Sequence, residues 1–230
     1  MTHFLLFDLI GVLVEAKTVR QQYRANLAQI MSARYGNTPD FWRKIDQQIV
    51  EDWASFHADL NFSGDDGIAD MHEALFRVTR ALFTMAHISE PPKPEITTLA
   101  NDLISTPHGV LLPDVLPMLE KCQKQGCQIG GMSYFLDAQT TAILHSTALE
   151  KYIKITVSPD TLNHYDHDAR FFEKVRHHLQ VQSEQITVIS HSVLTHTAAI
   201  QSGINAVLVR QSAASLDIDL TEILEHNLWK

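Results

Sequence analysis

Hydrophobic and polar positions alternate in two different ways along the chain. From residue 111 onward, short apolar runs alternate with stretches of helical periodicity, which is typical of successive βα units on a parallel sheet. The opening apolar run adds one more strand, so the pattern predicts five parallel strands. The predicted strands are 4–7, 127–132, 152–157, 185–189 and 205–209, and the predicted helices between them are 114–125, about 136–149, 169–179 and about 194–202.

Two of these strands have a continuous apolar pattern. Phe4 to Phe7 and Ala206 to Val209 contain no polar position. Strands of a parallel sheet that are covered on both faces have this composition. Both runs are therefore predicted to be buried on both faces.

Residues 15 to 108 have a different pattern, because strand-like runs give way to long amphipathic stretches. The predicted helices are 18–35, 39–58, 67–87 and 94–105, separated by segments rich in glycine, proline and aspartate. The sequence thus predicts an α/β core domain, 1–14 and 109–230, interrupted by an inserted helical domain at 15–108. We interpret the spaced aromatic residues of the insert as its core rather than as a substrate pocket: Phe41, Trp42, Trp53, Phe56, Phe76 and Phe83.

Composition and charge restrict the class of protein. The 230 residues are 45% hydrophobic, which is enough to bury a core of ordinary size. The formal charge of -9 disfavours nucleic acid and anionic membrane surfaces as partners. No apolar run approaches the roughly 18 residues of a membrane span. The opening residues lack a basic leader and a cleavage pattern, and we interpret Cys122 and Cys127 as reduced thiols. We expect a soluble cytoplasmic protein.

Polar residues follow several of the predicted strands. In an open parallel sheet, ligands bind where the carboxyl ends of the strands meet. This edge should gather Asp8, Ser133, the loop 158–168 and the loop 190–195. Asp8 and Ser133 each have a structural alternative: Asp8 can cap the turn around Gly11, and the Ser133 hydroxyl can form hydrogen bonds with loop amides.

The segments around these positions resemble the haloacid dehalogenase superfamily. FDLIGVLVE resembles its opening motif, which usually reads D-x-D-G-T, and LLPDVLPMLEKCQKQGCQIGGMS resembles the approach to its second motif. LEKYIKITVSPD followed by DARFFEKVRHHL resembles the third region, and ITVISHSVLTHTAAIQSGINAVLV resembles the fourth. The resemblance covers about residues 3 to 210. It implies a Rossmann-like core with a helical cap, and a small phosphorylated or halogenated substrate bound between them.

The resemblance also implies residue roles. Asp8 matches the nucleophile, which forms a covalent intermediate, and Ser133 matches the hydroxyl that orients the substrate. Ile10, Gly11, Tyr134 and His191 are predicted to contact the substrate. Ile10 stands where phosphotransferring members have a second acid, and loss of such an acid typically removes about 10²- to 10⁴-fold in rate. Dehalogenating members also lack this acid.

Two further elements of the family's site are missing. The lysine of the third region aligns with Tyr165 or Asp166, and the acids of the fourth align with Ser190-His191 and with Thr195 or His196. Mg²⁺ prefers hard oxygen ligands, so weak or absent Mg²⁺ binding is predicted.

Histidines occupy or flank these positions. If the loop 164–168 and the loop with His191 and His196 converge beside Asp8, their His and Asp residues could form a Zn²⁺ or Mn²⁺ site. We favour the alternative, in which they are solvated loop residues. The predicted function is an Asp8-dependent hydrolase of a small molecule, with weak or altered activity in which His191 or the 164–168 group supplies the missing charge. The alternative is a catalytically inactive relative that binds a small molecule or a protein. The sequence does not indicate an oligomeric state.

Overall fold

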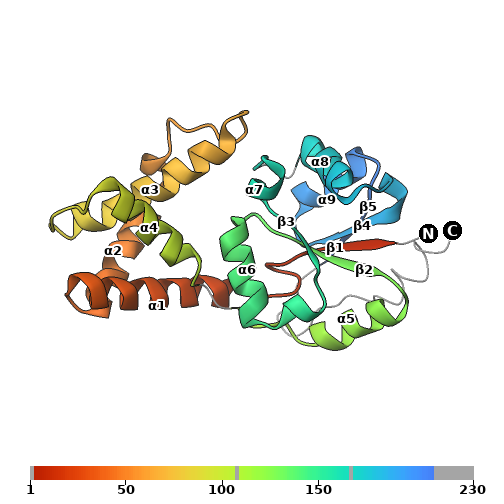
Figure 1. The fold of residues 1–230 in the computed structure, drawn as a ribbon, viewed down its shortest axis with the longest axis horizontal. Coiled ribbons are helices and arrows are strands. Elements are labelled where there is room, and N and C mark those ends of the chain that lie inside the picture. Colours follow the sequence, from red (N-terminus) through yellow and green to blue (C-terminus); the bar gives the residue numbers. More distant parts are fainter. Residues whose placement is uncertain (1–2, 107–108, 166–167, 210–230) are drawn as a thin grey trace.

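A five-stranded parallel sheet forms one half of the molecule and a group of helices forms the other (Figure 1). The computed structural model describes residues 3–106, 109–165 and 168–209. The strand order is β3-β2-β1-β4-β5, and the bounds are β1 Phe4–Asp8, β2 Gln128–Met132, β3 Ile155–Val157, β4 Ile186–Ser190 and β5 Asn205–Leu208. The predicted fold class, an α/β core with an inserted helical cap, is confirmed.

Helices cover both faces of the sheet. They are α5 Val115–Lys124, α6 Asp137–Ser146, α7 Pro159–Leu162, α8 Ala169–Leu179 and α9 Val193–Gln201, with 3₁₀ turns at Leu149–Lys151 and Ser183–Gln185. Successive side chains of a strand point to opposite faces. Leu5 and Phe7 of β1 therefore pack in one buried cluster, and Phe4 and Leu6 pack in the other. β1 is thus buried on both faces, as predicted, and it lies in the centre of the sheet.

The helical cap lies between β1 and α5 in the sequence. It consists of α1 Ala16–Tyr35, α2 Pro39–Glu51, a 3₁₀ turn Trp53–Phe56, α3 Gly67–Met85 and α4 Lys93–Ile104. Trp42 and Phe83 are fully buried in its core, against which Phe41, Phe56 and Phe76 pack. Trp53 is 44% exposed, so its assignment to the core was wrong.

The chain enters and leaves the cap at neighbouring points. Glu15 N donates to Val110 O at 2.9 Å, and Leu112 N donates to Leu13 O at 2.9 Å. Helix α1 starts directly after this pairing and runs along the cap (Figure 1). The two segments that connect the cap to the core are therefore hydrogen-bonded to each other.

Several predicted elements differ from the structure. β5 is an edge strand whose residues are exposed or half-buried, so the prediction of burial on both faces was wrong. The strand predicted at 152–157 begins only at Ile155, because the 3₁₀ turn Leu149–Lys151 precedes it. The helix predicted at 39–58 ends at Glu51, and the predicted loop 158–168 contains α7.

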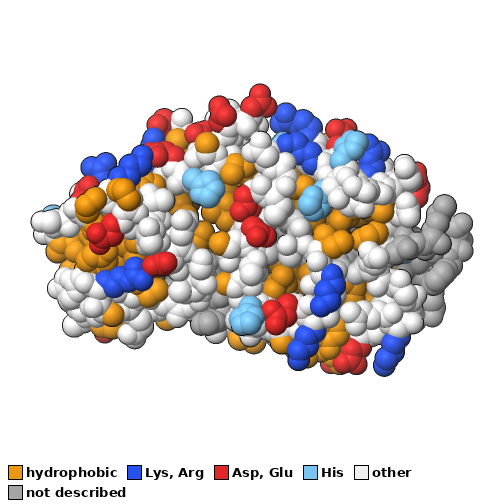
Figure 2. Space-filling model, viewed as in Figure 1, with side chains coloured by type: hydrophobic (Ala, Val, Ile, Leu, Met, Phe, Trp, Pro, Cys, Tyr) orange, Lys and Arg blue, Asp and Glu red, His pale blue; other side chains and the backbone are white. Residues whose placement is uncertain are grey.

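The surface view in Figure 2 shows acidic, basic and histidine side chains interspersed with apolar ones. This face has no extended basic surface. Among the described residues, no helix has the length and apolar character needed to cross a membrane.

Candidate active site

Asp8 lies at the carboxyl end of the central strand β1 and is 2% exposed. The chain turns back directly after it. Leu9 N donates to Met132 O of β2, and Val14 N donates to Leu9 O, each at 2.9 Å or less. The buried strand and this tight loop hold the Asp8 carboxylate at the edge of the sheet where ligands of parallel sheets bind.

Gly11 is required in this loop for two reasons. Its φ is +90°, a conformation that side chains with a Cβ rarely adopt. A Cβ on Gly11 would also lie 2.7 Å from Cε1 and Nδ1 of His191, well inside van der Waals contact. The absence of a side chain at Gly11 therefore lets the His191 imidazole lie directly against the loop that follows Asp8.

Ser190 and His191 converge on one oxygen of Asp8. The buried Ser190 hydroxyl, at the end of β4, donates a short hydrogen bond to Asp8 Oδ2. His191 Nδ1 lies 3.6 Å from the same oxygen, which is an ion-pair distance rather than a close hydrogen bond. The nearby Asp8 carboxylate, as an acceptor within reach and as a negative charge, raises the pKa of His191 against the opposing effect of burial. The imidazolium form is thus favoured beside Asp8.

Ser133 and Tyr134 follow β2, the strand that pairs with β1 on the other side. Ser133 is 3% exposed, and its hydroxyl oxygen accepts a hydrogen bond from Phe135 N at 3.0 Å. The oxygen still carries its own proton, which it can donate. Both the structural role and a role in orienting substrate are therefore compatible with its position.

Tyr134 connects this loop to α9, because its hydroxyl is hydrogen-bonded to the hydroxyl of Thr195. Burial is the largest cause that raises the pKa of Tyr134, and the charge of Asp8 raises it further, while hydrogen bonds to Thr195 and Ser192 lower it. Tyr134 is therefore close enough to Asp8 for the carboxylate charge to affect its ionisation.

Ile10 lies in the loop that also holds Gly11, and its half-buried side chain packs against the apolar cluster on one face of the sheet. An alkyl group neither donates nor accepts a proton. The side chain at this position can shape the site, but it cannot act in proton transfer.

Comparison with solved structures supplies the relationship to known proteins. No protein-family model matches the sequence, and no curated protein matches it either. A defluorinating L-2-haloacid dehalogenase matches with a TM-score of 0.61 at 13% identity, over 90% of this chain and 80% of the other. The L-2-haloacid dehalogenase of Xanthobacter autotrophicus with chloropropionic acid covalently bound matches with a TM-score of 0.56 at 15% identity, over 98% and 83%.

A HAD-hydrolase of Bacillus subtilis bound to magnesium matches with a TM-score of 0.60 at 14% identity, over 90% of this chain and 89% of the other. The chain has the haloacid dehalogenase fold. At these identities the likeness establishes the fold alone, and it agrees with the resemblance of the sequence motifs.

In the third region of this chain, no described lysine forms a hydrogen bond or an ion pair with Asp8. Lys154 Nζ donates to Glu150 O at 2.8 Å, and Lys174 Nζ donates to Asn163 O at 2.7 Å. Tyr165, one candidate for the lysine position, lies with its ring 5.4 Å from that of Phe62 and so joins core to cap. Asp166, the other candidate, lies outside the described residues.

The donors near Asp8 do not fit a Mg²⁺ site. Magnesium requires several hard oxygen ligands. Here Asp8 Oδ2 is engaged by Ser190 and His191, and the Thr195 hydroxyl is bonded to Tyr134. In the parts of the chain that the structure describes, no three His, Cys, Asp or Glu side chains are grouped so as to hold a metal ion.

The histidines of the two loops lie in separate pairs. His164 Nε2 is hydrogen-bonded to Asp168 Oδ1 at 2.8 Å, whereas His191 faces Asp8. His167 lies outside the described residues, and the structure gives no contact between His196 and Asp8. The proposed Zn²⁺ or Mn²⁺ ligands are thus not gathered among the described histidines.

The sequence predicted that the loop 190–195 lies at the same sheet edge as Asp8 and that His191 contacts the substrate, but it did not predict the hydrogen bond from Ser190 to Asp8. The two partners are 182 positions apart and meet because β1 and β4 pair in parallel. The apolar run ending in Ser190 was the available signal, since it places a hydroxyl at the strand end next to Asp8.

Proposed function

We propose that the protein is an Asp8-dependent hydrolase that replaces the halogen of a small 2-haloacid by a hydroxyl group. The observation that carries the proposal is the engagement of Asp8 Oδ2 by both Ser190 and His191. This arrangement leaves Oδ1 as the attacking atom. The names of the matched L-2-haloacid dehalogenases support the choice of substrate class.

The first step needs no acid at position 10. Oδ1 of Asp8 attacks the carbon that carries the halogen, a C–O bond forms as the carbon–halogen bond breaks, and the halide leaves with the electron pair. A halide leaves without a proton, whereas the alkoxide of a phosphate ester needs one. Ile10 is therefore compatible with substitution at carbon and unfavourable for phosphoryl transfer.

Charge also favours substitution at carbon. Phosphoryl transfer depends on cations that neutralise several phosphate oxygens, and neither a described lysine nor a Mg²⁺ donor set is present beside Asp8. A 2-haloacid carries one negative charge, which a single imidazolium at His191 can offset. The predicted activity is nevertheless low, because no described lysine of the third region contacts Asp8 to neutralise the nucleophile and the substrate together.

The second step hydrolyses the ester formed on Asp8. Water attacks Cγ, negative charge develops on Oδ2, and collapse of this intermediate expels the hydroxy acid with Oδ1; one proton and the halide are the other products. Ser190 and His191 are already directed at Oδ2. Donors fixed where charge develops in this way are typically worth about 10²- to 10³-fold in rate.

Halide release from both enantiomers of 2-chloropropionate, in the presence of chelator, tests the proposal. We expect slow release by the unaltered protein, none by Asp8→Ala, and unchanged release by His196→Gln, a nearby histidine without a contact to Asp8. In a single turnover in H₂¹⁸O, the label should enter Asp8 and not the product. Release that persists in Asp8→Ala would exclude the mechanism.

The second candidate is a catalytically inactive protein that binds a small molecule in the cleft. It is favoured by the lack of a lysine contact to Asp8 among the described lysines of the third region. Absence of halide release, together with saturable binding of a 2-haloacid that depends on His191, would support this candidate over the enzyme.

A further inference from the structure

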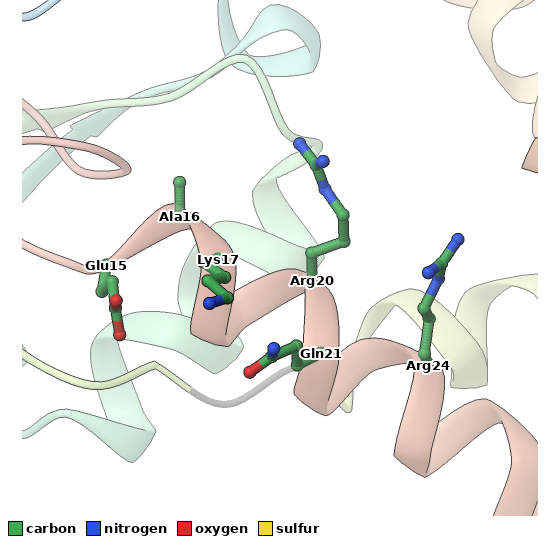
Figure 3. Close-up of a pocket in the computed structure, with 6 residues that line it drawn as sticks. All are labelled: Glu15, Ala16, Lys17, Arg20, Gln21 and Arg24. Carbon is green, nitrogen blue, oxygen red and sulfur yellow. The ribbon is translucent and has the colours of Figure 1, made fainter.

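The two cysteines of the chain lie away from the candidate active site. Cys122 belongs to the last turns of α5, and Cys127 directly precedes β2. The strand then runs to Met132, the partner of Asp8, which is roughly 17 Å further along an extended chain. By contrast, the groove along the start of α1 lies where the cap leaves the core, and we regard it as part of the cleft between them (Figure 3).

The chain between the two cysteines forms a tight turn at the end of α5. Cys127 N donates to Cys122 O at 3.1 Å, and Gly126 N donates to Gln123 O at 2.9 Å. Together with the φ of +81° at Gly126, these two bonds define a Schellman motif. A main-chain hydrogen bond of this kind leaves the two Cα atoms roughly 5–6 Å apart, which is within the span of a disulfide.

The two side chains share one apolar environment. Cys122 is fully buried in the cluster between α5 and the sheet, and the half-buried Cys127 packs against the same cluster. Side chains at these two positions of a Schellman motif commonly contact each other. Burial, and after it the charge of an ionised Cys127, raise the pKa of Cys122 to about 12. The two thiols are therefore neighbours, and Cys127 is the one that solvent reaches.

We propose that Cys122 and Cys127 form a redox-active dithiol that a peroxide converts to a disulfide. The Cys127 thiolate attacks one oxygen of hydrogen peroxide, the O–O bond breaks, hydroxide leaves, and a sulfenic acid remains on Cys127. The Cys122 sulfur then attacks the Cys127 sulfur, so that an S–S bond forms, the S–O bond breaks and a second hydroxide leaves. The two thiol protons convert both hydroxides to water, so two thiols and one peroxide give one disulfide and two water molecules.

The pairing of the thiols determines the end point of this oxidation. The reaction is slow near neutral pH, because only the thiolate attacks and burial raises the pKa of Cys127 as well. An isolated sulfenic acid proceeds to irreversible sulfinic and sulfonic acids, whereas one beside a second thiol ends as a disulfide that a reductant reverses. The dithiol thus gives the protein a reversible site of oxidation, and neither step involves Asp8.

Mass spectrometry of the full chain after treatment with hydrogen peroxide tests the proposal. Trypsin cleaves after Lys124, which lies between the two cysteines, so a digest distinguishes the two states. After free thiols are blocked, the reduced protein gives two separate cysteine peptides and the oxidised protein gives one cross-linked pair. We expect an intact mass lower by two hydrogen atoms, the cross-linked pair, and the return of both separate peptides after treatment with dithiothreitol.

Two variants assign the roles of the thiols. In Cys122→Ala, the sulfenic acid on Cys127 should persist and react with dimedone. In Cys127→Ala, the Cys122 thiol should be oxidised about tenfold or more slowly than the thiols of the unaltered protein, because it is fully buried. The mass of the unaltered protein decides the proposal even where a variant does not fold. An unchanged mass, sulfinic acid on Cys127 without a cross-linked pair, or a disulfide between two copies of the chain would overturn it.

Discussion

Replacing Gly11 by alanine should displace His191 from Asp8. The added Cβ would lie 2.7 Å from the imidazole, and relief to an ordinary contact moves the ring by roughly 1 Å. The Nδ1 to Oδ2 distance of 3.6 Å then becomes about 4.6 Å. At an effective dielectric constant of about 20, this weakens the attraction by roughly 1 kcal/mol, and solvent screening of a side chain that is 41% exposed reduces the figure to a fraction of that.

Two consequences can be measured. The pKa of His191 should fall toward its ordinary value, because its attraction to Asp8 is the cause of the rise. The steady-state rate of halide release should also fall, because each turnover includes hydrolysis of the ester, in which the charge that develops on Oδ2 loses one of its two donors. The pKa is measured from the imidazole NMR signal that is absent in His191→Gln, and the rate from released halide.

Gly36→Ala is the matched control. Gly36 has a φ of +77° and no atom within 4 Å of an added Cβ, so alanine there introduces the strain of a positive φ without the contact. Both variants should lose about 1–2 kcal/mol of stability from that strain. Only Gly11→Ala should change the His191 pKa and the rate. An unchanged pKa in Gly11→Ala, or an equal change in Gly36→Ala, would refute the inferred role of this contact.

Three further predictions concern the same site. Halide release should fall as pH rises through the raised pKa of His191, because the imidazolium loses its proton. The stability that the ion pair of His191 with Asp8 contributes should be lost over the same pH range. A pH-rate profile checks the first expectation, and the profile of His191→Gln should lack this fall in rate. Ser190→Ala should reduce the rate about 10²- to 10³-fold, measured as kcat, with Ser192→Ala as a control that leaves Asp8 Oδ2 engaged. Ile10→Asp alone should give no strong phosphatase activity on p-nitrophenyl phosphate with Mg²⁺, since the lysine and the metal-binding acids are still missing; a large gain would show that a cation reaches Asp8 from elsewhere in the chain.

The elements of the fold could be predicted from the sequence because each depends on local periodicity. Helix α8 has the predicted bounds, 169–179, and β1 extends the predicted strand by one residue, Asp8. β5 was misjudged because an apolar run does not report whether its strand lies in the centre or at the edge. That depends on the strand order, which no local pattern contains.

The candidate site was only partly predictable for the same reason. Asp8 could be located because it interrupts an apolar strand and precedes Gly11. The contacts of Ser190 and His191 with Asp8 depend on the pairing of β1 with β4 and on the space left by Gly11. The residue types at positions 190 and 191 suggested a loss of metal-binding acids, whereas the structure shows that Ser190 and His191 both contact the Asp8 carboxylate.

The pairing of the two segments that connect the cap to the core has an evolutionary and a practical consequence. Because Glu15 is hydrogen-bonded to Val110 and Leu13 to Leu112, the two ends of the insert start from almost one point of the core. A segment attached in this way can be exchanged for another of different size without separating β1 from its neighbouring strands. The core that presents Asp8 and the inserted cap can therefore diverge at different rates, and chimaeras joined at these two positions provide a direct way to exchange caps between relatives.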